Sequence, residues 1–113
     1  MHSSTWKESF TAEIENALQA RADGKEGQAR VCARRAAGIA INEYMQRKSL
    51  PIPGPSAYER LVYLKNDPNS SPDVIELADH LILRVNTDFN LPSEVDLISD
   101  ARHLAVLLGL DVI

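Results

Sequence analysis

The segment ARVCARRAAGIAI, residues 29–41, limits the choice of fold more than any other part of the chain. Small side chains recur there every three or four residues, as they do along one side of a helix. On a helical wheel one broad face collects Ala29, Cys32, Ala33, Ala36, Ala37, Ala40 and Tyr44. Because such small side chains let a second helix approach closely, we expect residues 25–48 to form the central helix of a bundle.

Four more segments repeat apolar residues at the three- and four-residue spacing of an amphipathic helix. They cover about residues 4–22, 55–66, 72–86 and 93–108. Their apolar stripes are Trp6, Phe10, Ile14, Ala17 and Leu18; Tyr58, Leu61, Val62 and Leu64; Val74, Leu77, Ala78, Leu81 and Val85; and Val95, Ile98, Ala101, Leu104, Ala105 and Leu108. No segment alternates apolar and polar residues between turn signals, so we expect no strand.

The predicted helices begin and end at residues that suit those positions. Gly24 and Gly109 are the expected helix stops, since glycine readily takes the left-handed conformation found there. Ser71, which precedes a proline, is the expected N-cap of the fourth helix. Ser93 and Asp96 have the spacing of a capping box at the start of the fifth.

The chain has the size and composition of one helical domain. Its 113 residues are enough for a single core, and 44% of them are hydrophobic while only 5% are aromatic. The core must therefore be built from Leu, Ile, Val and Ala, which favours helices over a β-sandwich. We predict an all-α, single-domain bundle of about five antiparallel helices over residues 1–113.

Charge and cysteine content exclude several classes of protein. The formal net charge of −4 argues against a general electrostatic grip on nucleic acid or an anionic membrane. No apolar run approaches the length of a membrane span and the first residues lack a signal-peptide core, so we expect a cytoplasmic protein without membrane contact. Cys32 is the only cysteine, which excludes an intramolecular disulfide and a cysteine-based zinc site.

No pattern in the sequence points to catalysis. The five glycines are scattered, so there is no glycine-rich phosphate loop. His80 shares a helix face with Glu76 and Arg84, which we interpret as solvated. His103, next to Arg102, is interpreted as part of a satisfied polar edge. Since no His-Glu-x-x-His motif or nucleophile accompanies either histidine, we expect no catalytic residue, no metal ligand and no cofactor.

The arginines of the alanine-rich segment have two interpretations. Arg30 and Arg34 share one flank of the predicted helix, whereas Arg35 points elsewhere. In the interpretation we favour, each guanidinium pairs with a carboxylate while its methylene stem covers apolar surface. The candidate carboxylates are Glu26, Asp96 and Asp100. In the alternative, Arg34 or Arg35 faces a groove and binds a phosphate or carboxylate of a ligand.

The segment SLPIPGPSAYERL, residues 49–61, also has two interpretations. Its three prolines and one glycine forbid both a helix and a central strand in its first half. It forms either a stiff connector that tucks Leu50 and Ile52 against the bundle, which we favour, or a strip that presents Tyr58 and Arg60 to a partner. The candidate ligand-binding residues of the whole chain are Arg34, Arg35, Tyr58 and Arg60.

The layout resembles the HEPN superfamily of small microbial helical domains. The resemblance rests on FTAEIENALQAR, ARVCARRAAGIAINEYM, SAYERLVYLKN, VIELADHLILRV and DLISDARHLAVLL, which cover most of the chain. It implies an all-α bundle, frequent dimerisation, and a groove for a nucleotide or a partner protein such as a nucleotidyltransferase. Ribonuclease members carry an arginine four to six residues ahead of a histidine. No arginine stands at that spacing ahead of His80 or His103, so we expect no nuclease activity.

Two functions are predicted. The first is a non-catalytic helical module that binds a nucleotide, RNA or an acidic protein surface. The nucleotide and the RNA are the ligands that the HEPN resemblance implies. The alternative is a homodimeric structural or interaction protein without a small-molecule ligand, in which exposed apolar stripes pair with a second copy. The first places the ligand in a groove between helices, and the second places a copy of the chain on an apolar face.

Overall fold

Five α-helices account for the regular structure of residues 5–82 and 96–110, which are the residues that this computed structural model describes. They are α1 (Thr5–Ala22), α2 (Glu26–Arg47), α3 (Ala57–Asn66), α4 (Pro72–Ile82) and α5 (Leu97–Leu107). No residue in these two ranges lies in a strand. The all-α prediction is confirmed, and each helix falls within the segment predicted for it.

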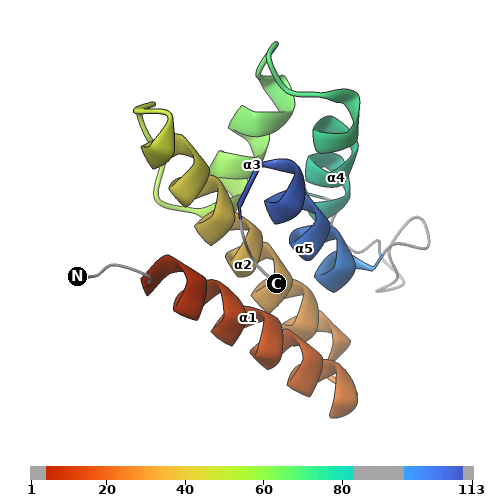
Figure 1. Cartoon of the computed structure of the whole chain (residues 1–113). Helices are drawn as coiled ribbons and strands as arrows, with labels where there is room; N and C mark the ends of the chain where they lie inside the picture. The colour runs from red at the N-terminus through yellow and green to blue at the C-terminus, as the bar shows by residue number, and fades with distance from the viewer. Residues whose placement is uncertain (1–4, 83–95, 111–113) are drawn as a thin grey trace.

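Helix α2 is the centre of the fold, as its alanine-rich face predicts. Figure 1 shows α1 alongside α2 and running in the opposite direction, with α3, α4 and α5 gathered around the rest of α2. Helix α1 packs almost entirely on α2, whereas α2 also contacts α3, α4 and α5. The small side chains of α2 therefore allow several helices to pack against it.

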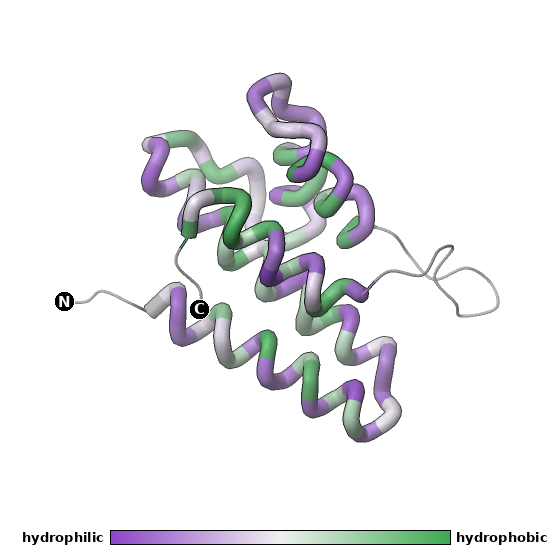
Figure 2. Tube along the Cα trace, turned by 45° about the vertical axis from the view of Figure 1, so that its right-hand side comes forward, coloured by the Kyte–Doolittle hydropathy of each residue, from purple (hydrophilic) through white to green (hydrophobic). Residues whose placement is uncertain are grey.

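The core is built on this small-residue face. Cys32 is 2% exposed, and Ala29, Ala33, Ala36, Ala37 and Ala40 are completely buried. The largest fully buried side chains around them are Ile41, Met45, Leu61, Leu64, Leu81, Leu97 and Leu104. Burial of each leucine contributes about 2 kcal/mol. Figure 2 shows hydrophobic and hydrophilic stretches alternating along the helices, as expected of amphipathic helices around one core.

Three helices end in the same way, with a residue in the left-handed conformation. Gly24 (φ 77°) and Gly109 (φ 83°) end α1 and α5, which confirms both predicted stops. Ser49 (φ 56°) does the same after α2, although it is not a glycine. In each case the next N–H donates to the carbonyl five residues earlier, at 2.8–3.0 Å. These bonds satisfy carbonyls that the helix itself leaves unpaired.

The predicted start of α4 is confirmed, and that of α5 is corrected. The Ser71 side chain accepts from Val74 N at 3.2 Å, as an N-cap does. Helix α5 begins at Leu97 rather than 93, because Asp96 is extended (φ −112°, ψ 100°) and its side chain accepts from Ile98 N and Ser99 N in the first turn. Asp96 is thus itself the N-cap. Ser93, its predicted partner in a capping box, lies outside the described residues.

Two residues of the predicted apolar stripes lie at the surface. Leu18 is 41% exposed, because α1 has one main neighbour and buries only the strip that contains Phe10, Ile14 and Ala17. Tyr58 in α3 is 46% exposed. The prediction that the fourth helix continues past Ile82, and the stripe residues Val85 and Val95, fall outside the described residues.

Candidate functional site

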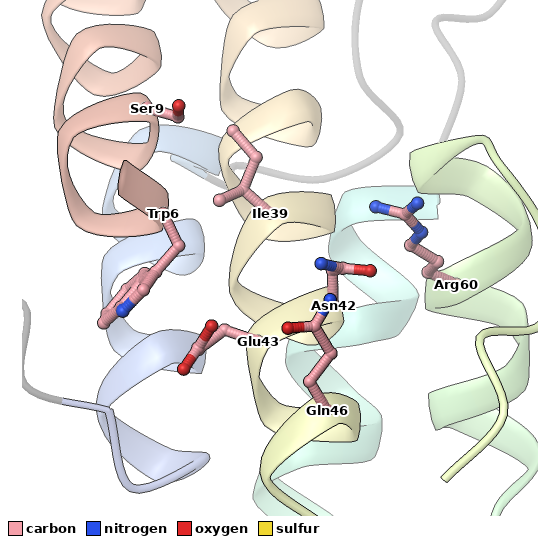
Figure 3. A pocket seen from close by; sticks show the side chains of 7 residues that line it. All are labelled: Trp6, Ser9, Ile39, Asn42, Glu43, Gln46 and Arg60. Carbon is pink, nitrogen blue, oxygen red and sulfur yellow. The ribbon is translucent and has the colours of Figure 1, made fainter. Parts of the chain in front are cut away.

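A groove lies between α1, α2 and the start of α3. It consists of two adjoining cavities, of about 450 and about 260 Å³, with Ile39 and Arg60 in the walls of both. The larger is also lined by Trp6, Ser9, Asn42, Glu43 and Gln46, and the smaller by Glu13, Arg35, Gly38, Pro55 and Ala57. In Figure 3, Trp6 on α1 and Arg60 on α3 stand at opposite sides, with the α2 side chains between them.

A close contact between α2 and α3 brings Arg60 to this groove. A Cβ added at Gly38 would lie 2.8 Å from the Ala57 Cβ, so only glycine permits the approach. Helix α3 starts at this point because Ser56 and Glu59 form a capping box, in which the Ser56 Oγ accepts from Glu59 N at 3.1 Å. Arg60 therefore stands in the first turn of α3, against α2.

Two carbonyl groups hold the Arg60 guanidinium in place. Its Nε donates to Gly54 O at 3.1 Å, and its Nη1 donates to Gly38 O at 3.2 Å. No carboxylate in the described ranges pairs with it. Because a carbonyl orients a positive charge without neutralising it, Arg60 keeps its charge and further N–H donors for an anion.

Arg35 contributes a second guanidinium to the same groove. Its side chain is exposed in α2, and it forms no hydrogen bond or ion pair with another described residue. Arg30, which likewise has no ion pair in the described part of the chain, does not line the groove. The fold thus brings together two of the four predicted ligand-binding residues, Arg35 and Arg60.

The other two predicted residues lie elsewhere. The Arg34 Nε donates to Leu81 O at 2.7 Å and so ties α2 to α4. Arg34 points away from Arg35 because successive residues of a helix are turned by about 100°. Neither Arg34 nor Tyr58 lines the two cavities.

One buried carboxylate oxygen in the groove wall has no hydrogen-bond partner among the described residues. The Glu13 Oε1 is buried and forms no hydrogen bond with a described residue. An unsatisfied buried acceptor costs about 1–3 kcal/mol. Such atoms are rare in folded proteins, so Glu13 marks this wall as a place where the chain does not complete its own hydrogen bonding.

The opposite end of the groove is electrically balanced. The Arg47 Nε donates to Glu43 Oε2 at 2.8 Å, and the Arg47 guanidinium lies 5.6 Å from the centre of the Trp6 ring. The side-chain amides of Asn42 and Gln46 make no hydrogen bond with another described residue. This end therefore offers neutral donors and acceptors beside an aromatic ring.

The carboxylates predicted to neutralise the arginines of the alanine-rich segment have other partners. Glu26 and Asp96 both bind Arg21, at 2.8 and 3.1 Å. The hydrogen bonds to Glu26 and Asp96 outweigh partial burial and raise the pKa of Arg21. The sequence does not reveal this cluster, because Asp96 is 75 residues from Arg21 and only the fold brings the two together.

Asp100, the third of these carboxylates, faces a histidine. The His80 Nδ1 lies 3.1 Å from Asp100 Oδ2, and its Nε2 lies 3.8 Å from Glu76 Oε2. Burial raises the pKa of Asp100 above its usual range, against the opposing influence of His80. The prediction of a solvated His80 is therefore corrected, because the side chain links α4 to α5 and is only 27% exposed. Arg84, on the same predicted face, is outside the described residues.

The segment before α3 takes the role favoured for it and also helps to form the groove. Leu50 and Ile52 are half-buried against the core, as predicted for a connector. Pro55 and Arg60, in the same segment, line the groove. Trp6 was expected only as part of an apolar stripe, and nothing in the sequence pointed to the two amides. The one available signal for Glu13 was its place as a polar residue inside the apolar strip of α1.

Comparison with known proteins gives no functional assignment for this site. Neither a protein-family model, nor a curated protein, nor a solved structure matches this chain. Within residues 5–82 and 96–110, no three metal-ligating side chains converge, and no helix is long and apolar enough to cross a bilayer. The resemblance to the HEPN superfamily stays a prediction.

Proposed function

We propose that this chain is a non-catalytic binding module that holds an anionic ligand in the groove between α1, α2 and α3. The observation that carries the proposal is the pair of guanidiniums, Arg35 and Arg60, which line one groove and have no carboxylate partner among the described residues. The ligand classes considered are a nucleotide, a short RNA and an acidic segment of another protein.

The geometry of the two arginines supports anion binding in different ways. Arg60 is oriented in advance by two carbonyls, so little side-chain entropy is lost when it binds. Arg35 is exposed and adjusts to the ligand. A charge-assisted hydrogen bond from either guanidinium is about twice as strong as a neutral one, and the attraction weakens as salt screens it.

The test is a titration of the ¹⁵N-labelled chain, followed by NMR, with inorganic phosphate, a nucleoside monophosphate, a short RNA and an oligoglutamate peptide. We expect saturable shifts of main-chain amides around Arg35 and Ile39 with at least one anion, reduced by salt and by Arg35→Met. The matched control is Arg102→Met, which removes an exposed arginine of α5 that does not line the groove. No saturable shift with any of the four anions would refute the proposal.

A homodimer is the second candidate, favoured by exposed apolar side chains at the end of α5. Val106 is 56% exposed and its neighbour Leu107 is 38% exposed. Such side chains in one turn suit a contact with a second copy. Sedimentation equilibrium should then show a dimer that Val106→Asp dissociates. A monomer at micromolar concentration would exclude this candidate.

A further inference from the structure

We infer that the occupant of the groove is an extended acidic peptide segment of another protein, bound with its acidic residue at Arg35 and Arg60. This rests on the function proposed above and selects one of its three ligand classes. It follows from the length of the groove, its distribution of charge and its unpaired amides, taken in turn.

The groove follows α2 for about three turns, which suits an extended chain. Its lining follows α2 from Arg35 to Gln46, and these twelve residues extend over about 16 Å of the helix axis. An extended peptide advances about 3.3 Å per residue, so about five residues match this length. A single phosphate or carboxylate ion would occupy only the Arg35 end.

The charge distribution favours a ligand that is negative at one end. The smaller cavity contains Arg35 and Arg60 with one carboxylate, Glu13. The larger cavity shares Arg60 with the smaller one, and at its Trp6 end the Glu43 carboxylate is matched by Arg47. A nucleic acid carries a negative charge at every nucleotide and would face Glu43 at this second end, whereas a peptide can be neutral there. The net charge of −4 works against a polyanion as well.

Unpaired side-chain amides on the groove floor match a peptide main chain. Asn42 and Gln46 are four residues apart on α2, on the same side of the helix. Each amide has both donors and an acceptor, and neither side chain is hydrogen-bonded to a described residue. A peptide main chain presents N–H and C=O groups in turn, so both amide functions find partners. Trp6 and Ile39 supply apolar surface for a side chain of the same segment.

The experiment is a selection from a phage-displayed library of random heptapeptides on the immobilised full chain, with a parallel selection on Arg35→Met. We expect enriched peptides with Asp or Glu about four positions from an aromatic or aliphatic residue. Synthetic copies should bind at least tenfold more weakly to Arg35→Met, and more weakly to Asn42→Ala. Arg102→Met should bind them as the wild type does, since Arg102 is exposed on α5.

A six-nucleotide RNA, titrated into the same three variants, separates the outcomes. If RNA binds in an Arg35-dependent way and no acidic peptide is enriched, the peptide inference is wrong while the proposed function stands. If enriched peptides are basic, or bind Asn42→Ala as well as wild type, the inference fails through its charge or its amide argument. If neither RNA nor peptide binds, the inference fails, and the function proposed for the groove fails with it when inorganic phosphate and the nucleoside monophosphate give no saturable NMR shift either.

Discussion

Two clusters of charge, one beside the α1–α2 turn and one in the groove, place guanidiniums where three elements of the fold meet. In the first, Arg21 bonds to Glu26 at 2.8 Å and to Asp96 at 3.1 Å. In the second, Arg60 bonds only to carbonyls among the described residues, and Arg35 has no described partner. Every charged group of the first cluster has a partner of opposite charge, whereas neither guanidinium of the second has a carboxylate partner among the described residues.

This difference is the basis for proposing a structural role for the first cluster and a binding role for the second. A paired guanidinium has little to gain from an added anion, because the anion must compete with a carboxylate already in place. An unpaired one gains the whole interaction. Exposed pairs contribute about 0–1 kcal/mol, so the Arg21 cluster stabilises the fold only slightly. In the proposed function, the two groove arginines forgo this small stabilisation and bind an anion instead.

The largest expected difference between a structural and a binding arginine is in the free energy of unfolding of variants at the neighbours Arg34 and Arg35. Arg34→Met should lower the free energy of unfolding by about 2 kcal/mol, since Leu81 O loses a charged donor. Arg35→Met should change it by less than about 0.5 kcal/mol, as expected of an exposed side chain. Urea unfolding at neutral pH measures both. Equal losses would show that the two arginines have the same role.

A methyl group added at Gly38 should distort the groove, and it should leave the Arg21 cluster undisturbed. Gly38→Ala places a Cβ 2.8 Å from the Ala57 Cβ, and we expect a loss of about 1.5 kcal/mol together with displacement of Arg60. Gly27→Ala is the matched control in the same helix, because its Cβ meets only the Arg30 Nη2, at 3.7 Å. Thermal unfolding of both variants should show a loss for Gly38→Ala alone.

Removing the unpaired carboxylate of Glu13 should stabilise the fold. Glu13→Met keeps the length of the side chain and removes the buried acceptor, so we expect a gain of about 1 kcal/mol. Glu15→Met, on the exposed side of α1, should have little effect. Chemical unfolding distinguishes the two. A loss of stability in Glu13→Met would mean that this carboxylate is satisfied in solution.

The smallest expected effects concern how stability depends on pH, and they differ in sign between Asp96 of the Arg21 cluster and Asp100 beside His80. Burial opposes ionisation of Asp96, but the hydrogen bonds from Arg21 and Ser99 N prevail and lower its pKa below 3.8. Burial raises the pKa of Asp100 above 3.8. Asp96 therefore contributes stability above pH 3.8 that is lost as pH falls through its folded pKa. Asp100 has the opposite sign, so stability falls as pH rises from 3.8 through its folded pKa.

Urea unfolding between about pH 3 and pH 6 checks both signs. The advantage of the wild type over Asp96→Asn should shrink toward acid pH, by a few tenths of a kcal/mol because the pair is exposed. The advantage over Asp100→Asn should grow toward acid pH. Two profiles that run in parallel would contradict the assignment of opposite pKa shifts.

Local features of the fold could be read from the sequence. The small-residue face of α2, the stops at Gly24 and Gly109 and the Ser71 cap depend on residues within one or two turns of one another, so their spacing is sufficient evidence. Leu18 was misplaced because helical periodicity shows which residues share a face, but not how much of that face a neighbour covers.

The candidate site was predicted only in part, for the same physical reason. Arg35 and Arg60 were recognisable as unusual residues, yet nothing local indicated that a Gly38–Ala57 contact would bring them to one groove. Glu13 was not singled out, since only packing shows that one of its oxygens is buried without a partner.

The sequence by itself determined that this chain forms helices, which helix lies at the centre and where most of them begin and end. These properties follow from side-chain size and from hydrogen bonds within a few residues. The tertiary structure alone decided which groups each arginine contacts in other parts of the fold, because these contacts join Arg21 to the Asp96 carboxylate across 75 residues and Arg34 to the Leu81 carbonyl across 47. Charge pairing depends on distance in space, and helical spacing specifies distance only along one helix.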